Sequence, residues 1–199
     1  MTSPLGAEKS ALRSLKIALR RNVPQQVAEA AAGQAARHAM ALLGKVGGRT
    51  IAVYMPVRGE LSPLPLVEKV REGGGAVALP HVVSDTAPMS FRLWQEGDPL
   101  EKGFGGIPEP GTSAPEVIPD VVVVPLAVFD RRGFRIGYGK GHYDRTLGPL
   151  VREERPLTVG YAFALQETEE VPREDHDVPL DAVITENGII RCNLSREGF

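Results

Sequence analysis

Residues 120–130, with the sequence DVVVVPLAVFD, form an almost unbroken apolar run in which β-branched valines predominate. Strands with one solvated face alternate apolar and polar side chains, whereas strands covered by helices on both faces read as continuous apolar runs. This segment therefore predicts a central strand of a sheet that lies between two layers of helices. That arrangement belongs to the α/β class.

Helical and strand patterns alternate along the rest of the chain. Residues 50–57 are apolar and β-branched, residues 62–74 have a helical pattern that ends in glycine, and residues 76–83 are apolar again, which makes a β-α-β unit. We predict one domain over residues 1–199, with three α/β/α layers and a mostly parallel or mixed central sheet of the Rossmann-like kind. Helices are also expected at 4–21, 25–43 and 145–154, and further strands at 88–94, 157–163 and 182–190.

Charge and hydropathy limit the classes of partner. With 23 Lys and Arg against 25 Asp and Glu, the formal charge is -2, so there is no overall basic field to hold a nucleic acid or an anionic membrane. The amino terminus lacks a cationic segment followed by an apolar stretch, and the apolar run at 121–129 is far too short to cross a bilayer. We expect a cytoplasmic monomer that binds neither nucleic acids nor membranes.

The segment GYGKGHYDR, residues 137–145, has glycines at alternate positions and follows the predicted buried strand. Ligands of open α/β sheets bind outside the carboxyl ends of such strands. Because glycine lacks a Cβ atom, the backbone can direct several N–H groups at one anion, and Lys140 adds a positive charge. Two interpretations remain open, a phosphate-binding loop and a plain tight turn, since neither common phosphate-loop spacing is present.

Four basic residues recur in the first predicted helix at spacings of four, three and four: Lys9, Arg13, Lys16 and Arg20. This spacing places them on one stripe of the helix, beside a second stripe of leucines at positions 5, 12, 15 and 19. We interpret the leucine stripe as the face turned toward the core. A basic stripe beside it is usually a solvated face, and the spacing by itself does not establish a ligand.

Five motifs occur in the order found in the 5-formyltetrahydrofolate cyclo-ligase family, also called 5,10-methenyltetrahydrofolate synthetases, and the chain resembles that family. The motifs are KSALR from Lys9, YMPVRGE ending at Glu60, GIPEP from Gly106, RIGYGKGHYDR from Arg135 and HDVPLDAVITE from His176. The resemblance runs from the first helix almost to the carboxyl terminus. The chain departs from the family pattern where many members have two adjacent tyrosines, here His142 and Tyr143, and at Lys140, which is glycine in many relatives.

The resemblance implies an ATP-dependent enzyme that converts 5-formyltetrahydrofolate to 5,10-methenyltetrahydrofolate, ADP and phosphate. The formyl oxygen attacks the γ-phosphorus of ATP, and N10 then closes on the resulting N5-iminium phosphate. The implied ATP contacts are Lys9, Arg13, Arg135, Ile136, Gly137, Tyr138, Gly139, Lys140, Gly141, His142 and Tyr143. The implied folate contacts are Met55, Glu60, Tyr138, Gly139, Lys140, Gly141 and His142, and the implied catalytic residues are Lys140 and Arg135.

The same resemblance implies that Mg²⁺ accompanies ATP and is held by Asp144 and Asp177. Mg²⁺ prefers one or two carboxylates together with phosphate oxygens and waters, which suits single, separated aspartates. Asp181 is nearby in the sequence, and it either shares the metal site or caps the last strand. We interpret His176 as a structural hydrogen-bonding residue.

Two other classes of function remain open. A sugar-phosphate isomerase-like enzyme can use a similar sheet and anion loop, but it does not need ATP. A nucleotide-binding sensor can keep the loop without turning over a substrate, because a fold alone does not establish function. The presence of Lys9 and Arg13 together with two metal-binding aspartates favours the ATP-dependent enzyme.

Overall fold

The structure, a computed structural model, describes residues 4–174 and 177–192. Within these residues the main sheet has eight strands in the order β12-β11-β10-β7-β1-β2-β3-β6. The pairings from β11 to β2 are parallel, and those of β12, β3 and β6 at the two edges are antiparallel. The strands are β1 (Thr50–Ala52), β2 (Ala76–His81), β3 (Ser90–Leu93), β6 (Glu116–Val117), β7 (Val121–Pro125), β10 (Leu157–Tyr161), β11 (Ala182–Thr185) and β12 (Gly188–Arg191).

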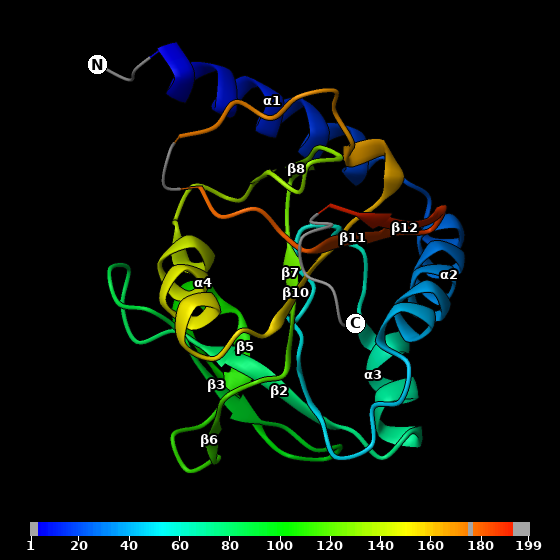
Figure 1. Cartoon of the computed structure of the whole chain (residues 1–199), viewed down its shortest axis with the longest axis vertical. Helices are drawn as coiled ribbons and strands as arrows, with labels where there is room; N and C mark the ends of the chain where they lie inside the picture. Colours follow the sequence, from blue (N-terminus) through cyan, green and yellow to red (C-terminus); the bar gives the residue numbers. More distant parts are fainter. Residues whose placement is uncertain (1–3, 175–176, 193–199) are drawn as a thin grey trace.

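Helices cover both faces of this sheet. Helices α2 (Gln25–Leu43) and α3 (Leu64–Glu72) lie on one side of the strands and α4 (His142–Glu153) on the other (Figure 1). One core cluster joins α2 and α3 to the sheet, and another lies between α4 and the opposite face. This arrangement confirms the predicted α/β/α layers and the mostly parallel, mixed sheet. No helix in the described part of the chain combines the length and apolar character needed to cross a membrane.

The apolar run at 120–130 supplies the middle of the sheet, but it is not one strand. Val121–Val124 are buried in β7, which ends at Pro125. The chain then enters a separate hairpin, in which β8 (Val128–Phe129) pairs with β9 (Arg135–Ile136). The prediction of a continuous strand is therefore wrong in its second half, because proline cannot donate to the ladder and the Ala127 N–H donates to the Ile136 carbonyl at 2.8 Å.

Strand β1 lies between β2 and β7, and the connections that follow β1 and β7 diverge from this point. From β1 the chain passes to β2 on one side, whereas from β7 it passes to β10 on the other. Such a switch in strand order opens a crevice at the carboxyl ends of the strands. The hairpin of β4 (Leu100–Lys102) and β5 (Pro108–Pro110) packs next to β2.

Helix α1 (Pro4–Arg21) lies across the carboxyl edge of the sheet, outside the two helical layers (Figure 1). Our prediction of its orientation is wrong: the side chains of Leu15 and Leu19 are largely in solvent, at 54% and 46% exposure, whereas Arg20 is 2% exposed. Leu12 and Ile17 still pack on the small apolar cluster at the hairpin. The helix therefore turns its basic stripe, not its full leucine stripe, toward the protein.

Two boundaries differ from the predictions in ways that bear on the crevice. Regular strand β1 ends at Ala52, so residues 53–57 belong to the connection at the carboxyl edge. Helix α4 begins at His142, earlier than the predicted 145, because Gly141 serves as its N-cap. The end of the glycine segment therefore forms the first turn of a helix.

Candidate active site

A cavity of about 350 Å³ opens where the connections after β1 and β7 diverge. Its walls come from residues 54–60, from residues 104–109 between β4 and β5, and from residues 135–144. The predicted site residues that line it are Met55, Glu60, Arg135, Gly137, Tyr138, Lys140, Gly141, His142, Tyr143 and Asp144. The fold thus brings most of the predicted folate and nucleotide residues to one place.

The glycine loop, residues 137–141, leads from β9 into α4. Gly139 and Gly141 have φ of +85° and +67°, the left-handed region that glycine adopts without a Cβ clash. No described side chain caps the α4 N-terminus. The N–H groups of the first helical turn are therefore left for a ligand, and the helix dipole favours a negative one there.

We expect Gly141→Ala to lower the free energy of unfolding by about 1–2 kcal/mol, because an L-residue is strained at this left-handed φ. The added Cβ would also meet Arg145 Nη1 at 2.8 Å. Urea denaturation measures the change. Gly137→Ala is the matched control, because its added Cβ meets nothing within 4 Å and its φ is not in the left-handed region. Equal losses in the two variants would contradict a special backbone role for Gly141.

The two outer basic residues of α1 contact the segments that carry the predicted site. Lys9 Nζ lies 2.8 Å from Asp177 Oδ2, and Arg13 Nε donates to the Gly137 carbonyl at 2.7 Å. Desolvation works against the charge of Lys9, but its bonds to the acids raise its pKa overall. These contacts therefore argue against a purely solvated basic face.

The two inner basic residues of α1 bind backbone carbonyls. Lys16 Nζ donates to the carbonyls of Leu165 and Glu167 at 2.8 and 2.6 Å. Arg20 Nη2 donates to the Arg58 carbonyl at 2.9 Å. Carbonyl groups at the ends of strands and in loops need donors, and these side chains supply them. Polar contacts at this edge therefore explain the orientation of α1.

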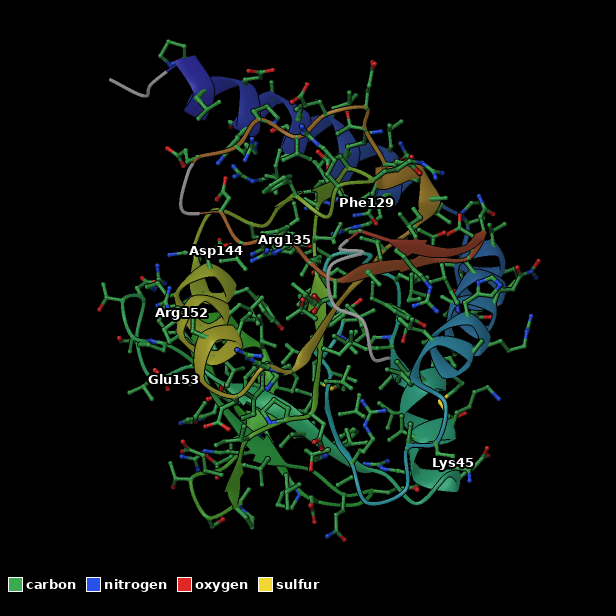
Figure 2. All side chains as sticks on the ribbon, in the orientation of Figure 1. Lys45, Phe129, Arg135, Asp144, Arg152 and Glu153 are labelled. Atoms are coloured by element: carbon green, nitrogen blue, oxygen red, sulfur yellow. The ribbon has the colours of Figure 1, made fainter. Side chains whose placement is uncertain are left out.

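Arg135 lies between the two predicted metal-binding segments. Its Nη1 donates to the Val178 carbonyl at 2.8 Å, and its Nη2 bonds to the carboxylate of Asp144. Both Arg135 and Asp144 lie near the first turn of α4 (Figure 2). Burial lowers the pKa of Arg135, whereas the charges of Asp144 and Asp177 raise it. An arginine stays charged under these conditions, so the guanidinium is a fixed positive group at the cavity wall.

The predicted aspartates are the type of ligand that Mg²⁺ takes when it arrives with a phosphate. The side chain of Asp144 is 43% exposed, and the carboxylate of Asp177 accepts the Glu174 N–H at 2.9 Å. Among the residues that the structure describes, no group of three His, Cys, Asp or Glu side chains can hold a metal. Mg²⁺ often uses one or two carboxylates and completes its shell with phosphate oxygens and waters.

Asp181 lies away from the cavity, at the starting edge of β10 and β11. Its Oδ2 accepts the N–H and the hydroxyl of Thr158, each at 2.8 Å. This contact favours the interpretation of Asp181 as a strand cap over a share in the metal site. His176, which we interpreted as structural, lies outside the described residues.

Glu60 is a half-buried carboxylate on the cavity wall. Its Oε2 accepts the Val57 N–H at 2.8 Å. Burial raises the pKa of Glu60, while a hydrogen bond to Tyr138, the Val57 N–H and the charges of Arg20 and Arg58 oppose that rise. A carboxylate has about four acceptor positions, so Glu60 keeps acceptors for a donor-rich ligand.

A sequence model of the 5-formyltetrahydrofolate cyclo-ligase family matches residues 6–186 of this chain. The chain belongs to this family. The 5-formyltetrahydrofolate cyclo-ligase of Mycolicibacterium smegmatis is 35% identical over 190 residues, which cover 92% of this chain and 96% of the relative. The cyclo-ligase of Escherichia coli K12 is 36% identical over 157 residues, which cover 76% and 86%.

Solved cyclo-ligase-related structures have the same fold. The 5,10-methenyltetrahydrofolate synthetase of Aquifex aeolicus aligns with a TM-score of 0.79 and 29% identity, covering 96% of each chain. The synthetase of Mycoplasma pneumoniae aligns with a TM-score of 0.71 over 89% of this chain and 98% of that one, and at 23% identity it supports the fold alone.

Some residues that we predicted for the cyclo-ligase site do not line the cavity. These are Lys9, Arg13, Ile136, Gly139 and Asp177. The side chain of Ile136 is buried in the hairpin cluster, and its carbonyl accepts the Ala127 N–H. Lys9 bonds to Asp177, and Arg13 bonds to the backbone of the glycine loop.

Lys140 lies on the open rim of the cavity. Its Nζ is 3.1 Å from Asp85 Oδ1, and both side chains are more than half exposed. It also lies 6.0 Å from the centroid of the Phe104 ring. The predicted catalytic lysine is thus paired with an acid from the loop after β2, and it faces the wall formed by residues 104–109.

Our sequence reasoning assigned no role to the wall at 104–109. Phe104 makes an edge contact with His142, with ring centroids 5.6 Å apart. Glu109 lies 2.9 Å from His81 Nδ1 and accepts the Val82 N–H. The GIPEP motif of the cyclo-ligase pattern, from Gly106, was the available signal, because it falls in this wall.

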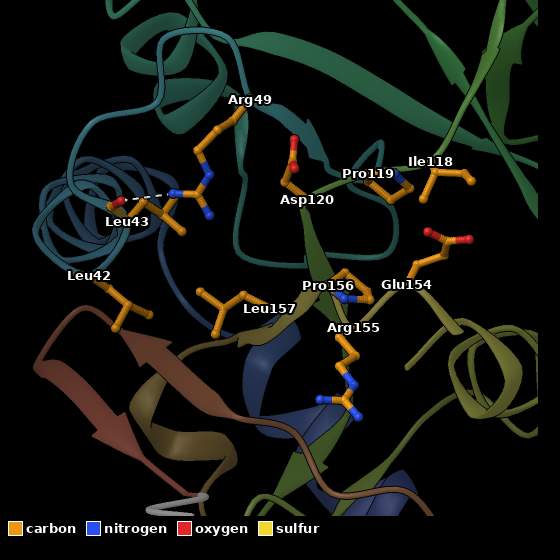
Figure 3. Close-up of a pocket in the computed structure, with 10 residues that line it drawn as sticks. All are labelled: Leu42, Leu43, Arg49, Ile118, Pro119, Asp120, Glu154, Arg155, Pro156 and Leu157. Carbon is orange, nitrogen blue, oxygen red and sulfur yellow. Dashed lines mark hydrogen bonds between the residues drawn. The ribbon is translucent and has the colours of Figure 1, made fainter. Parts of the chain in front are cut away.

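A second cavity, of about 490 Å³, lies at the opposite edge of the sheet, where β1, β7 and β10 begin (Figure 3). Arg49, Asp120, Glu154 and Arg155 surround it together with apolar side chains. None of the predicted cyclo-ligase residues lines it. Open α/β sheets bind ligands at the other edge, so we place the candidate active site in the first cavity.

Proposed function

We propose that this chain catalyses the ATP-dependent cyclisation of 5-formyltetrahydrofolate to 5,10-methenyltetrahydrofolate, with release of ADP and phosphate. Membership in the cyclo-ligase family supports this activity. The observation that carries it is the meeting of two unlike sites in one cavity. Glu60 offers acceptors for the guanidine-like edge of a pterin on one wall, and the glycine loop with the α4 N-terminus offers donors for phosphates on another.

The chemistry needs both substrates side by side. A formamide oxygen is a poor leaving group, so the formyl oxygen first attacks the γ-phosphorus of ATP and ADP departs. N10 then attacks the carbon of the N5-iminium phosphate, and phosphate leaves with the formyl oxygen. Phosphoryl transfer of this kind depends on positioning and on neutralisation of charge rather than on covalent participation by the protein.

The main residues of the site have the following roles in this proposal. The backbone of the glycine loop and the α4 N-terminus bind the triphosphate, with Lys9 and Arg13 supplying charge from α1. Arg135 faces the transferring phosphoryl group, and Lys140 closes the rim. Met55 packs against the folate ring system. Lys140 and Arg135 are the proposed catalytic residues.

We also propose Mg²⁺ as the cofactor, held by Asp144 and Asp177 together with oxygens of ATP. Bound there, it supplies positive charge that offsets the charge of the phosphates. In the structure these carboxylates are paired with Arg135 and Lys9. Lys9 can then turn to the phosphates when Asp177 exchanges it for the metal, while Arg135 keeps its bond to the Val178 carbonyl. That the chain is a single domain and acts as a cytoplasmic monomer stays a prediction.

The direct test is turnover by purified protein. The protein is mixed with 5-formyltetrahydrofolate and MgATP, and the conjugated methenyl product is followed by absorbance. We expect product in proportion to ADP formed. A folded protein that makes no product with ATP present overturns the proposal, and binding of ATP without turnover would indicate the nucleotide sensor instead.

We expect Glu60→Gln to raise KM for 5-formyltetrahydrofolate about tenfold or more and to leave KM for ATP within about twofold. The amide keeps the side-chain volume but loses the charge and one acceptor, and a hydrogen bond to a charged group contributes about 1.5–3 kcal/mol. Steady-state kinetics with each substrate varied in turn measure the split. Glu109→Gln, on the neighbouring wall, is the control, and it should leave KM for 5-formyltetrahydrofolate nearly unchanged. Equal damage to both KM values by Glu60→Gln would contradict a dedicated pterin role.

A further inference from the structure

We propose that Arg20 is a positioning residue that orients Tyr138 and Glu60 for recognition of the folate pterin. The inference rests on the proposed function, which gives Glu60 its ligand. It adds a residue to which the family resemblance assigned no role. Arg20 contributes from α1, an element otherwise expected to serve only ATP.

One side chain joins two walls of the cavity. Arg20 Nη1 donates to the Tyr138 hydroxyl at 2.7 Å, and its Nη2 donates to the Arg58 carbonyl at 2.9 Å. Its guanidinium carbon lies 5.6 Å from the centroid of the Tyr138 ring. Tyr138 belongs to the glycine loop, and Arg58 belongs to the segment that carries Glu60. The relative position of the two segments therefore depends on Arg20.

The bond from Arg20 also determines what the Tyr138 hydroxyl can donate to. A hydroxyl has one proton and two lone pairs. Arg20 occupies a lone pair, so the proton is left for another acceptor, and Tyr138 and Glu60 lie close enough for each to shift the pKa of the other. Burial raises the pKa of Tyr138, which keeps it a donor. The Val57 N–H fixes one oxygen of the Glu60 carboxylate, and Arg20 fixes the Tyr138 hydroxyl beside it.

Stability alone is a poor reason for this arginine. Arg20 is 2% exposed, and its buried Nε finds no acceptor among the described residues. Among the residues that the structure describes, no carboxylate lies within ion-pair distance of the Arg20 guanidinium. Burying a charge without a paired acid is costly. Lys16 docks the same helix through two carbonyls at less burial, so docking does not require a buried guanidinium.

The charge of Arg20 also bears on the ionisation of Glu60. The titratable or charged groups that face this carboxylate are Tyr54, Tyr138, Tyr143, Arg20 and Arg58. Of these, the two arginines lower the pKa of Glu60 against the effect of burial. Removal of Arg20 raises that pKa further. The variant therefore keeps Glu60 protonated up to a higher pH than the wild type does, and it regains the carboxylate as the pH rises.

The test is the affinity for 5-formyltetrahydrofolate, measured by calorimetry between about pH 5 and pH 8, a range that begins just above the ordinary pKa of glutamate. We expect Arg20→Met to weaken folate binding about tenfold at the lower pH and to recover part of the loss at the higher pH. Affinity for ATP should change by less than about threefold. The ratio of variant to wild-type affinity at each pH cancels the effect of any titration of the ligand itself. Arg20→Lys, which keeps the charge, should restore most of the pH profile.

Lys16→Met is the matched control, because it removes a cation that anchors the same helix but does not touch Glu60. It should lower thermal stability and leave the wild-type pH profile. In a Glu60→Gln background, Arg20→Met should no longer change the pH dependence. If Arg20→Met does not fold, Tyr138→Phe removes the hydroxyl that accepts from Arg20 Nη1. This variant should weaken folate binding with the same pH dependence.

The outcomes separate the two proposals. Wild-type protein that does not bind 5-formyltetrahydrofolate overturns the proposed function. Wild-type binding together with an unchanged pH profile in Arg20→Met, or in Tyr138→Phe, overturns the role of Arg20 and leaves the proposed function intact. A pH profile in Lys16→Met like that of Arg20→Met would show that loosening of α1 is enough, and would also overturn it.

Discussion

Replacing Arg135 by methionine is expected to slow turnover about a thousandfold, the order that a charge-neutralising arginine contributes to phosphoryl transfer. The guanidinium is almost fully buried at the cavity wall, and its side chain is held by Val178 and Asp144. A fixed positive charge in a water-poor site stabilises developing negative charge more than an exposed one does. Methionine keeps much of the length and removes the charge.

Single-turnover rates at saturating substrates measure the effect on the chemical step. Arg131→Met is the matched control, because Arg131 is exposed in the same hairpin and pairs with Glu167 outside the cavity. We expect the control to turn over at nearly the wild-type rate. A small effect of Arg135→Met on the single-turnover rate, with the loss confined to KM, would show that Arg135 binds substrate without assisting phosphoryl transfer.

Asp144→Asn is expected to raise the Mg²⁺ concentration for half-maximal turnover at least about tenfold, because changes around metal ligands cost roughly 10–100-fold in affinity. Asparagine preserves the shape of the side chain but removes the charge that draws the ion. The same loss should appear without turnover, as a weaker Mg²⁺ dependence of ATP affinity in calorimetry. Asp177→Asn should act in the same direction.

Asp181→Asn separates this assignment from a general effect of losing an acid. Asp181 bonds to Thr158 at the far edge of the sheet, so its replacement should reduce stability and leave the Mg²⁺ dependence unchanged. An unchanged Mg²⁺ requirement in Asp144→Asn and Asp177→Asn, or a larger change in Asp181→Asn, would mean that the metal is bound by other carboxylates.

The layers of the fold were predictable because they depend on local patterns. The valines of β7 are apolar on both faces, and this predicts cover by helices whatever the rest of the chain does. The end of that strand was harder to predict, because the hairpin at 128–136 depends on a pairing across the loop. The proline inside this apolar run was a local signal for the break, because proline is rare in the interior of a central strand.

The orientation of α1 could not be read from its own residues. Leucine and basic stripes normally indicate a core face and a solvated face. Here Lys16 and Arg20 meet carbonyls at the carboxyl edge of the sheet, and those acceptors come from segments more than thirty residues away. The wall at 104–109 was missed for a related reason, since it reaches the cavity through the pairing of β4 with β5 and its packing on β2.

The polar attachment of α1 has a consequence for how the chain meets its ligands. This helix contributes few apolar side chains to the interior, and Leu15 and Leu19 remain in water. Segments with little buried apolar surface open at a lower free energy than the body of a protein. Molecules with α1 detached lack Lys9, Arg13 and Arg20 together, so affinity is reduced by the fraction of the population in that state. A ligand that needs these cations therefore closes the helix as it binds, and amide exchange in α1 becomes a direct gauge of occupancy.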